Sequence, residues 1–317
     1  MTIDLHQHLW PAPFLAALRA RTTPPRLDGW TLHLGGEAPF AVDPAHHDVA
    51  ARTALAEEDG LALAAVAPSA ALGLERLPAV EFAELAAAWQ EGAAALPVPF
   101  RWWATAQEPG QLQAALDAGA LGLELGAGAL AAPHGLERVA PLFEALQAAG
   151  RPVLIHPGPA GEANAGGPGA GGDAARGPVA TGDAAGRPAW WAAAVPYVAE
   201  LHAAWWAWAD GGRERFPSLP VCFVALAGLG PLHGERVRAR GGRTRPVDPL
   251  TFVETSSYGA QAVDAVIRVL GIDVVCHGTD RPYAGPRPLP FGEAAEQAIR
   301  TTNPKRLLAA IPEPVPA

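Results

Sequence analysis

The fold of this chain is restricted most by a regular alternation of short apolar runs with longer amphipathic segments. Each apolar run has the length of a buried strand, and the segments between the runs have helical periodicity. Gly119, Gly150 and Gly271 stand where three of these helices would end. Strands that alternate with helices favour a sheet of parallel strands. The runs that predict strands cover residues 3–10, 61–67, 100–106, 121–125, 152–156, 220–226, 251–255 and 273–277.

Eight strands with intervening helices in 317 residues predict an α/β protein with a (β/α)₈ barrel, formed as a single domain by residues 1–317. A doubly wound sheet is the alternative, but that fold usually carries a glycine-rich phosphate-binding turn after its first strand. Here the position holds Trp10-Pro11-Ala12-Pro13. Residues 159–188 consist largely of Gly, Ala and Pro, so we expect a long flexible loop within the domain.

The composition of the chain restricts the kinds of molecule that we expect it to bind. The formal charge of −9 argues against nucleic acid, and the arginines between residues 236 and 245 are interpreted as a solvated helix end and loop. Gly, Pro or charged residues interrupt every apolar stretch before it could span a membrane, and Met1 leads directly into a predicted strand without a signal peptide. Cys222 and Cys276 lie in apolar runs, which indicates buried thiols rather than a disulfide. We therefore expect a cytoplasmic protein that acts on a small molecule, with a homodimer as a compatible assembly.

The first predicted strand carries two histidines that are separated by one residue. Side chains alternate along a strand, so His6 and His8 point to the same face, about 7 Å apart. Two imidazoles at this separation can bind one metal ion. A pair of buried structural histidines is the competing interpretation, and further ligands at the ends of later strands would favour the metal site.

Such ligands follow two later strands. In (β/α)₈ enzymes the working side chains lie at the carboxyl ends of the strands, and reading those ends adds His156 and Asp280. Three imidazoles and one carboxylate suit Zn²⁺, with Mn²⁺ as an alternative. The sequence thus predicts one divalent metal ion bound by His6, His8, His156 and Asp280. Glu124 is a weaker candidate for bridging a second ion, because a lone polar residue in a strand can also simply face the barrel interior.

With these residues in place, the sequence resembles the amidohydrolase superfamily, and within it the amidohydrolase-related (amidohydrolase 2) branch that contains aminocarboxymuconate-semialdehyde decarboxylase. The resemblance covers almost the whole chain in the same order, and it implies a barrel with a single catalytic metal ion held by the four residues named above. The matching pieces are Asp4-Leu5-His6-Gln7-His8, Pro152-Val153-Leu154-Ile155-His156-Pro157, Phe216-Pro217-Ser218-Leu219, Gly278-Thr279-Asp280-Arg281-Pro282 and Asn303-Pro304-Lys305-Arg306-Leu307-Leu308.

This chain lacks one residue that is usual in this branch. Its members usually carry a His-Gly-Gly step at the end of the sixth strand, where the histidine assists catalysis, and here Ala227 is placed at that histidine. His233, six residues further on, is a candidate to replace it from the loop, or else a surface residue at the start of a helix. The missing histidine argues against the decarboxylation that the resemblance suggests.

The leading hypothesis from the sequence is a metal-dependent hydrolase that acts on an ester, a lactone or an amide. The metal ion would activate water, and Asp280 would transfer the proton, with His233 as a second catalytic candidate. Trp10, Tyr258 and Arg281 are candidates for substrate contact, Arg281 through a substrate carboxylate. Two alternatives stay open. One is a non-oxidative, metal-dependent decarboxylase (carboxy-lyase) of an aromatic or unsaturated acid, and the other is a catalytically impaired barrel that binds a ligand.

Overall fold

Eight parallel strands form the centre of the protein. The computed structural model describes residues 2–35, 39–159, 188, 190–244 and 247–309. Hydrogen bonds join neighbouring strands in two groups, in the orders β1–β5–β6 and β7–β8–β9–β10–β11. The strands are β1 (Thr2–His8), β5 (Leu61–Ala67), β6 (Phe100–Trp102), β7 (Leu123–Gly126), β8 (Val153–His156), β9 (Val221–Phe223), β10 (Thr251–Glu254) and β11 (Val275–Cys276).

Two short contacts join these groups into a closed barrel. Ala104 pairs in parallel with Leu123, which links the chain after β6 to β7, and Gln7 pairs with Arg281, which links β1 to the chain after β11. Close to the second contact, the Asp280 N–H donates a hydrogen bond to the His6 carbonyl at 2.8 Å. The predicted (β/α)₈ barrel is therefore confirmed. Each predicted strand is present, and most of them are shorter than the apolar run that predicted them.

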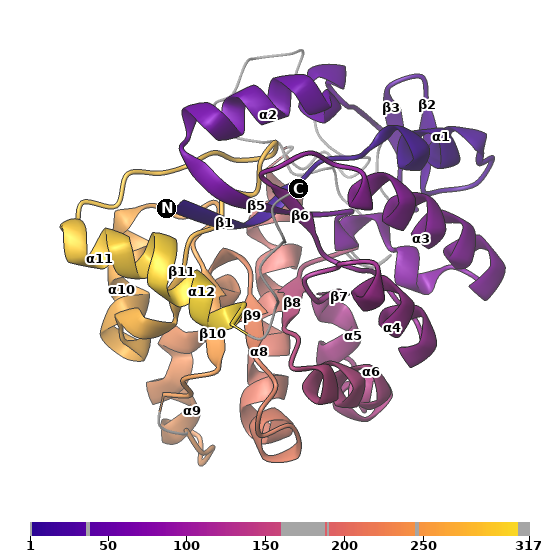
Figure 1. Ribbon diagram of the computed structural model, residues 1–317. Helices are drawn as coiled ribbons and strands as arrows, with labels where there is room; N and C mark the ends of the chain where they lie inside the picture. The colour runs from indigo at the N-terminus through magenta and orange to yellow at the C-terminus, as the bar shows by residue number, and fades with distance from the viewer. Residues whose placement is uncertain (1, 36–38, 160–187, 189, 245–246, 310–317) are drawn as a thin grey trace.

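The central strands are buried on both faces, because one face fills the barrel and the other packs against helices. In β7, β8, β9 and β10 every residue is buried. This explains why the sequence shows continuous apolar runs instead of an alternation of apolar and polar residues. Figure 1 shows the helices surrounding the strands. They are α1 (Ala12–Ala20), α2 (Val49–Glu58), α3 (Ala79–Ala94), α4 (Pro109–Asp117), α5 (Ala127–Ala131), α6 (Gly135–Ala149), α7 (Trp191–Ala194), α8 (Pro196–Arg215), α9 (Gly234–Ala239), α10 (Ala260–Leu270), α11 (Glu293–Gln297), the π-helix Ala298–Thr302 and α12 (Asn303–Leu307).

A small antiparallel sheet lies between the first two barrel strands in the sequence. It consists of β2 (Arg26–Asp28), β3 (Thr31–His33) and β4 (Phe40–Ala41), and the 3₁₀-helix Pro44–His47 follows it. His47 at the end of that helix is buried, and its ring stacks on Trp10 with 4.4 Å between the ring centroids. The ring of Trp30 is also parallel to that of His47, with 6.4 Å between the ring centroids. This stack fastens the small sheet to the end of β1.

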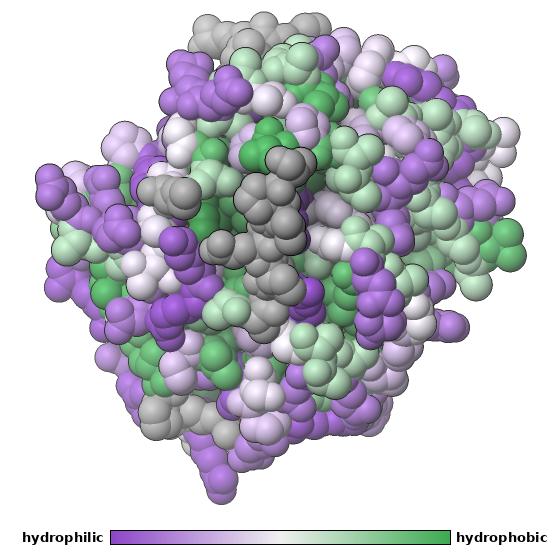
Figure 2. Space-filling view, viewed as in Figure 1, coloured by the Kyte–Doolittle hydropathy of each residue, from purple (hydrophilic) through white to green (hydrophobic). Residues whose placement is uncertain are grey.

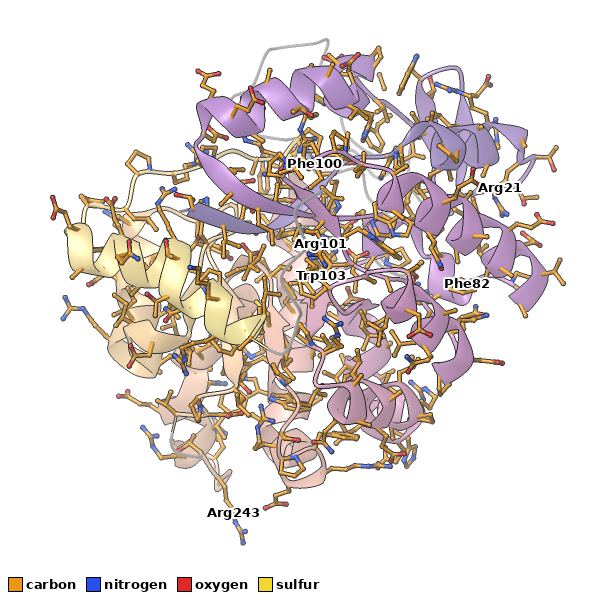
Figure 3. All side chains as sticks on the ribbon, in the orientation of Figure 1. Arg21, Phe82, Phe100, Arg101, Trp103 and Arg243 are labelled. Atoms are coloured by element: carbon orange, nitrogen blue, oxygen red, sulfur yellow. The ribbon has the colours of Figure 1, made fainter. Side chains whose placement is uncertain are left out.

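The arginines near the end of α9 lie on the surface, as the sequence predicted. Arg236, Arg238, Arg240 and Arg243 are exposed, and Figure 3 shows Arg243 projecting away from the molecule. Hydrophilic and hydrophobic residues are interspersed on the face drawn in Figure 2.

None of the helices in the described part of the chain is both long and apolar enough to cross a lipid bilayer. The flexible loop expected at 159–188 falls outside the described residues, apart from Pro159 and Pro188 at its ends.

Candidate metal centre

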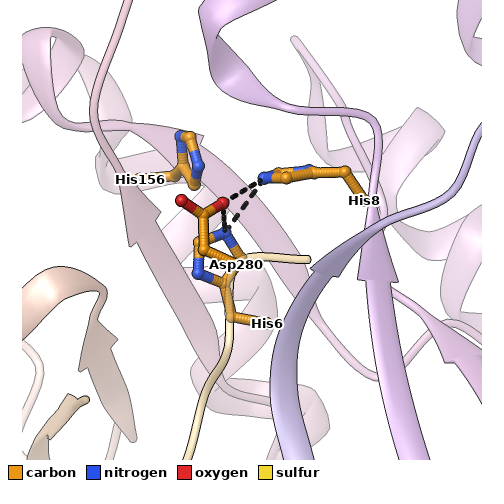
Figure 4. Close-up of side chains that lie close together, drawn as sticks. All are labelled: His6, His8, His156 and Asp280. Atoms are coloured by element: carbon orange, nitrogen blue, oxygen red, sulfur yellow. Dashed lines mark hydrogen bonds and ion pairs between the residues drawn. The ribbon is translucent and has the colours of Figure 1, made fainter. Parts of the chain in front are cut away.

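The structure brings the four predicted metal ligands together. His6, His8, His156 and Asp280 each offer a ligand atom, and these atoms all lie within 4.8 Å of one another. The Nε2 atoms of His6 and His8 are 3.1 Å apart, and Asp280 Oδ1 lies 3.2 Å from His8 Nε2 and 3.7 Å from His6 Nε2. The ring of His156 completes the group, with its centroid 4.9 Å from that of His6 and 5.1 Å from that of His8. Figure 4 shows the four side chains converging on one point from different parts of the chain.

Local structure explains this convergence. His6 and His8 share a face of β1 because side chains alternate along a strand, and His156 is the last residue of β8. Asp280 lies in the turn after β11 with a φ of 60°, a left-handed conformation that Asp tolerates better than most residues. All four therefore lie at the carboxyl ends of parallel strands, which is where barrel enzymes place their active sites.

The ionisation of the imidazoles fits a metal site. Burial lowers the pKa of His8 and lowers that of His156 further, so both rings are neutral and keep a lone pair for a metal ion. Burial acts in the same direction on His6, but its hydrogen bond to Glu254 and the charges of Asp280 and Glu254 raise its pKa to about 9. A metal ion would displace the proton from His6, as metals do on binding histidine. This donor set suits a divalent transition metal.

Glu254, the last residue of β10, orients His6 and is not among the residues predicted from the sequence. Its Oε1 lies 3.3 Å from Nδ1 of His6, on the side of the ring opposite to the ligand atom Nε2. The same carboxylate accepts hydrogen bonds from the Ala225 N–H at 2.7 Å, the Ser256 N–H at 2.7 Å and the Ser256 hydroxyl at 2.5 Å. Carboxylates that hold the second nitrogen of a metal-binding histidine fix its tautomer and orientation. The sequence did contain a signal, because Glu254 stands at a strand end.

Asp4 ties the two ligand-bearing segments to each other. Its carboxylate accepts hydrogen bonds from the His6 N–H at 3.1 Å and from the Gln7 side chain at 2.7 Å. It also accepts hydrogen bonds from the N–H and hydroxyl of Thr279, at 3.2 and 2.6 Å. The position of Asp280 relative to His6 therefore depends on a fully buried carboxylate that does not itself contact the candidate metal position.

A cavity of about 330 Å³ opens onto the four ligands. Trp10 lies in its wall, as expected, and its indole N–H donates to the Pro68 carbonyl at 2.8 Å. The small sheet contributes apolar side chains to the cavity, which were not predicted from the sequence. The apolar residues of the wall include Trp10, Leu32, Leu34, Phe40 and Leu72. A cavity of this size and character suits a small molecule.

The other candidates do not reach this cavity. The guanidinium of Arg281 turns away to pair with Asp59 at 2.7 Å, and Tyr258 packs against the core instead. His233 is exposed, and its ring lies against that of His202 with 4.6 Å between the centroids. None of the three is among the described residues that line the cavity. The structure therefore gives no support to substrate contact by Arg281 or Tyr258, or to catalysis by His233.

The end of the sixth barrel strand also differs from expectation. Ala225, and not Ala227, lines the cavity there, so Ala225 occupies the place from which a histidine would reach the ligands. Ala225 to Leu229 all have positive φ values, between 47° and 58°. A run of left-handed residues is unfavourable for side chains with a Cβ, and such conformations are concentrated at functional sites. Here the run directs the Ala225 N–H to Glu254.

Glu124 lies near the centre but is not one of the grouped ligands. It is buried, its Oε1 accepts a hydrogen bond from the Ala70 N–H at 3.3 Å, and burial raises its pKa to about 8. The structure therefore adds no support for a second metal ion bridged by Glu124.

Solved structures share this fold. IDCase from Metarhizium anisopliae superposes with a TM-score of 0.72 at 17% identity, over 98% of this chain and 97% of that chain. A 5-carboxyvanillate decarboxylase from Novosphingobium aromaticivorans, complexed with manganese and 4-hydroxy-3-methoxy-5-nitrobenzoic acid, gives 0.67 at 16% identity, over 98% and 96%. The 4-oxalomesaconate hydratase LigJ from Rhodopseudomonas palustris gives 0.65 at 15% identity, over 98% and 96%. At these identities the likeness establishes the fold alone. No protein-family model and no curated protein matches the sequence.

Proposed function

We propose that this protein is a metal-dependent enzyme of the amidohydrolase superfamily that hydrolyses an ester, a lactone or an amide. The observation that carries the proposal is the group of three buried histidines and one partly exposed aspartate at the floor of a small-molecule cavity. The fold is shared along almost the whole chain with a decarboxylase that was solved with manganese, which supports the same conclusion.

A divalent ion bound by these residues would lower the pKa of water and polarise a substrate carbonyl. Zn²⁺ is our first assignment, and the manganese in the decarboxylase with this fold supports Mn²⁺ as the alternative. Asp280 is the chain's own proton carrier. Its side chain is 22% exposed and it is the one carboxylate among the described residues that line the cavity, so it can take a proton from water and pass it to the leaving group.

Non-oxidative decarboxylation of an aromatic or unsaturated acid is the second candidate. It is supported by the name and ligand of the decarboxylase that shares the fold. Ala225 argues against it, because the branch that the sequence resembles usually has a catalytic histidine at this strand end. The two reactions differ in whether water becomes part of the product.

Product analysis separates these candidates. The metal-loaded protein is incubated in ¹⁸O-water with a panel of lactones, esters, amides and aromatic acids, and the products are analysed by mass spectrometry. A product acid that gains one ¹⁸O identifies a hydrolase, whereas loss of CO₂ from an acid without such a gain identifies a decarboxylase. The double variant His6→Ala/His8→Ala is the control for contaminating activities. A wild-type protein that binds metal but turns over nothing in the panel would instead favour the ligand-binding barrel.

A further inference from the structure

Among the described residues that line the cavity above the ligands there is one arginine and no lysine. This arginine is Arg287, and its guanidinium has no hydrogen bond or ion pair within the described part of the chain. The arginine predicted for substrate contact, Arg281, is neutralised by Asp59 outside the cavity. An arginine without a protein partner on the wall of a largely apolar cavity is available to pair with a negatively charged group of a ligand.

The backbone around Arg287 is constrained on both sides. The segment reads Gly285-Pro286-Arg287-Pro288-Leu289-Pro290, and a residue before proline is confined to extended conformations. Leu289 is 4% exposed and anchors the segment in the core. Arg287 itself is exposed and is one of the residues that line the cavity, so its guanidinium is accessible to a ligand there. Binding an anion there requires little ordering of the backbone.

The remainder of the cavity determines what kind of molecule can carry that charge. Trp10, Leu32, Leu34, Phe40 and Leu72 present apolar or aromatic surface, whereas the hydrogen-bonding groups include Ser256 and Tyr283. Asp280 would repel a carboxylate that approaches it without an intervening metal ion. A compact molecule with a flat or apolar body and a carboxylate remote from the metal position would match the apolar wall, avoid Asp280 and pair with Arg287.

We propose that Arg287 is a specificity residue that selects substrates with such a remote carboxylate. The inference rests on the proposed function in taking the metal position as the reacting end of the cavity. It does not depend on whether the reaction is hydrolysis or decarboxylation, because in both cases Arg287 would bind a substrate group other than the one that reacts.

Binding of defined probes tests this assignment without turnover. The Zn²⁺-loaded protein is titrated by calorimetry with benzene-1,3- and benzene-1,4-dicarboxylate, and with the monoamide of each. Each pair differs in one charge at nearly constant shape, and the two isomers cover two distances from the metal. We expect the wild type to bind at least one dicarboxylate about ten-fold more tightly than its monoamide, a difference of about 1.4 kcal/mol.

Arg287→Ala should abolish this preference, and Arg287→Lys should keep part of it, because lysine retains the charge but not the bidentate geometry. Arg236→Ala, which removes an exposed arginine of α9 outside the cavity, should leave the preference unchanged. A preference that survives Arg287→Ala, or its absence from wild type for both isomers, overturns the assignment. A wild type that shows the preference and retains metal but lacks any turnover would refute the proposed function while leaving Arg287 as the anion site.

Discussion

At the scale of single residues, Asp280 differs from the other three ligands in its access to the cavity. The side chains of His6 and His8 are 2% and 1% exposed, whereas that of Asp280 is 22% exposed. A carboxylate that both contacts the metal position and faces the substrate can act as a base as well as a ligand.

Asp280→Asn should therefore cost more in turnover than in metal binding. The amide keeps the shape of the side chain but loses its basicity and its charge. Loss of general base catalysis typically lowers the rate about 10²–10⁴-fold. The measurement is the turnover rate with metal added until occupancy equals that of the wild type, and Asp273→Asn, an exposed isosteric change, is the control. If the metal-matched variant stays within a few-fold of wild type, Asp280 is a ligand only.

Glu254→Gln tests the support of His6. An amide nitrogen cannot accept the hydrogen bonds that Ala225 and Ser256 donate to the carboxylate, and it does not stabilise the proton on Nδ1 of His6 in the same way. Losses of this kind lower metal affinity about 10–100-fold. Competition with a chromophoric chelator measures the affinity, circular dichroism confirms folding, and Glu293→Gln on the exposed start of α11 is the matched control. Unchanged affinity in a folded variant would mean that Glu254 only supports the backbone.

At the scale of elements, the small sheet is attached to the barrel through a neutral histidine. His47 Nδ1 accepts a hydrogen bond from the Trp10 N–H at 3.0 Å, so the proton of the neutral ring is on Nε2. This Nε2 is buried, and no described residue is its partner. Burial, with smaller contributions from the charges of Arg52, His46 and His8, lowers the pKa of His47 to about 3. Protonation of this ring is therefore strongly unfavourable in the folded protein.

This depressed pKa predicts acid destabilisation. Below about pH 6.5 the unfolded chain takes up a proton at His47 that the folded chain does not, so the free energy of unfolding falls as the pH is lowered towards 3. The slope from this group is about 1.4 kcal/mol per pH unit. We expect wild type to lose about 2–3 kcal/mol more than His47→Gln between pH 6 and pH 4, as measured by urea unfolding. The glutamine keeps an acceptor for Trp10 but does not titrate, and parallel pH profiles for the two proteins would refute this assignment.

At the scale of the whole molecule, the candidate metal centre connects distant parts of the barrel. Its ligands come from β1, from β8 and from the turn after β11, so one ion would join the first and last barrel strands. Backbone contacts already close the barrel there, through the pairing of Gln7 with Arg281. A bound ion would add to this closure in the folded chain only.

Metal binding should therefore raise thermal stability. An ion that binds the folded state alone stabilises it by about 2.7 kcal/mol at a free concentration of one hundred times Kd. We expect about one equivalent of divalent metal per chain, and a lower Tm after removal with a chelator. In His6→Ala/His8→Ala the Tm should not respond to chelator or to added metal. A second tightly bound equivalent of metal in the wild type would support Glu124 as a bridging ligand.

The sequence by itself determined the barrel and the four residues of the candidate metal centre. Strand ends in a parallel barrel all face the same way, and side chains alternate strictly along a strand. Positions such as His6, His8 and His156 therefore follow from the order of apolar runs alone. Asp280 follows from the same rule, because the turn that carries it is tied directly to β1.

Only the tertiary structure decided which residues of the loops surround those ligands. Arg281 is adjacent to a ligand in sequence, yet its side chain pairs with Asp59, 222 residues away. Arg287, with no motif to mark it, is the arginine that lines the cavity, and Glu254 reaches His6 across 248 residues. The direction of a side chain in a loop depends on individual backbone angles and on partners that folding brings from elsewhere in the chain. Local patterns of sequence do not encode those partners, so the loop residues that surround the cavity could not be predicted from the sequence.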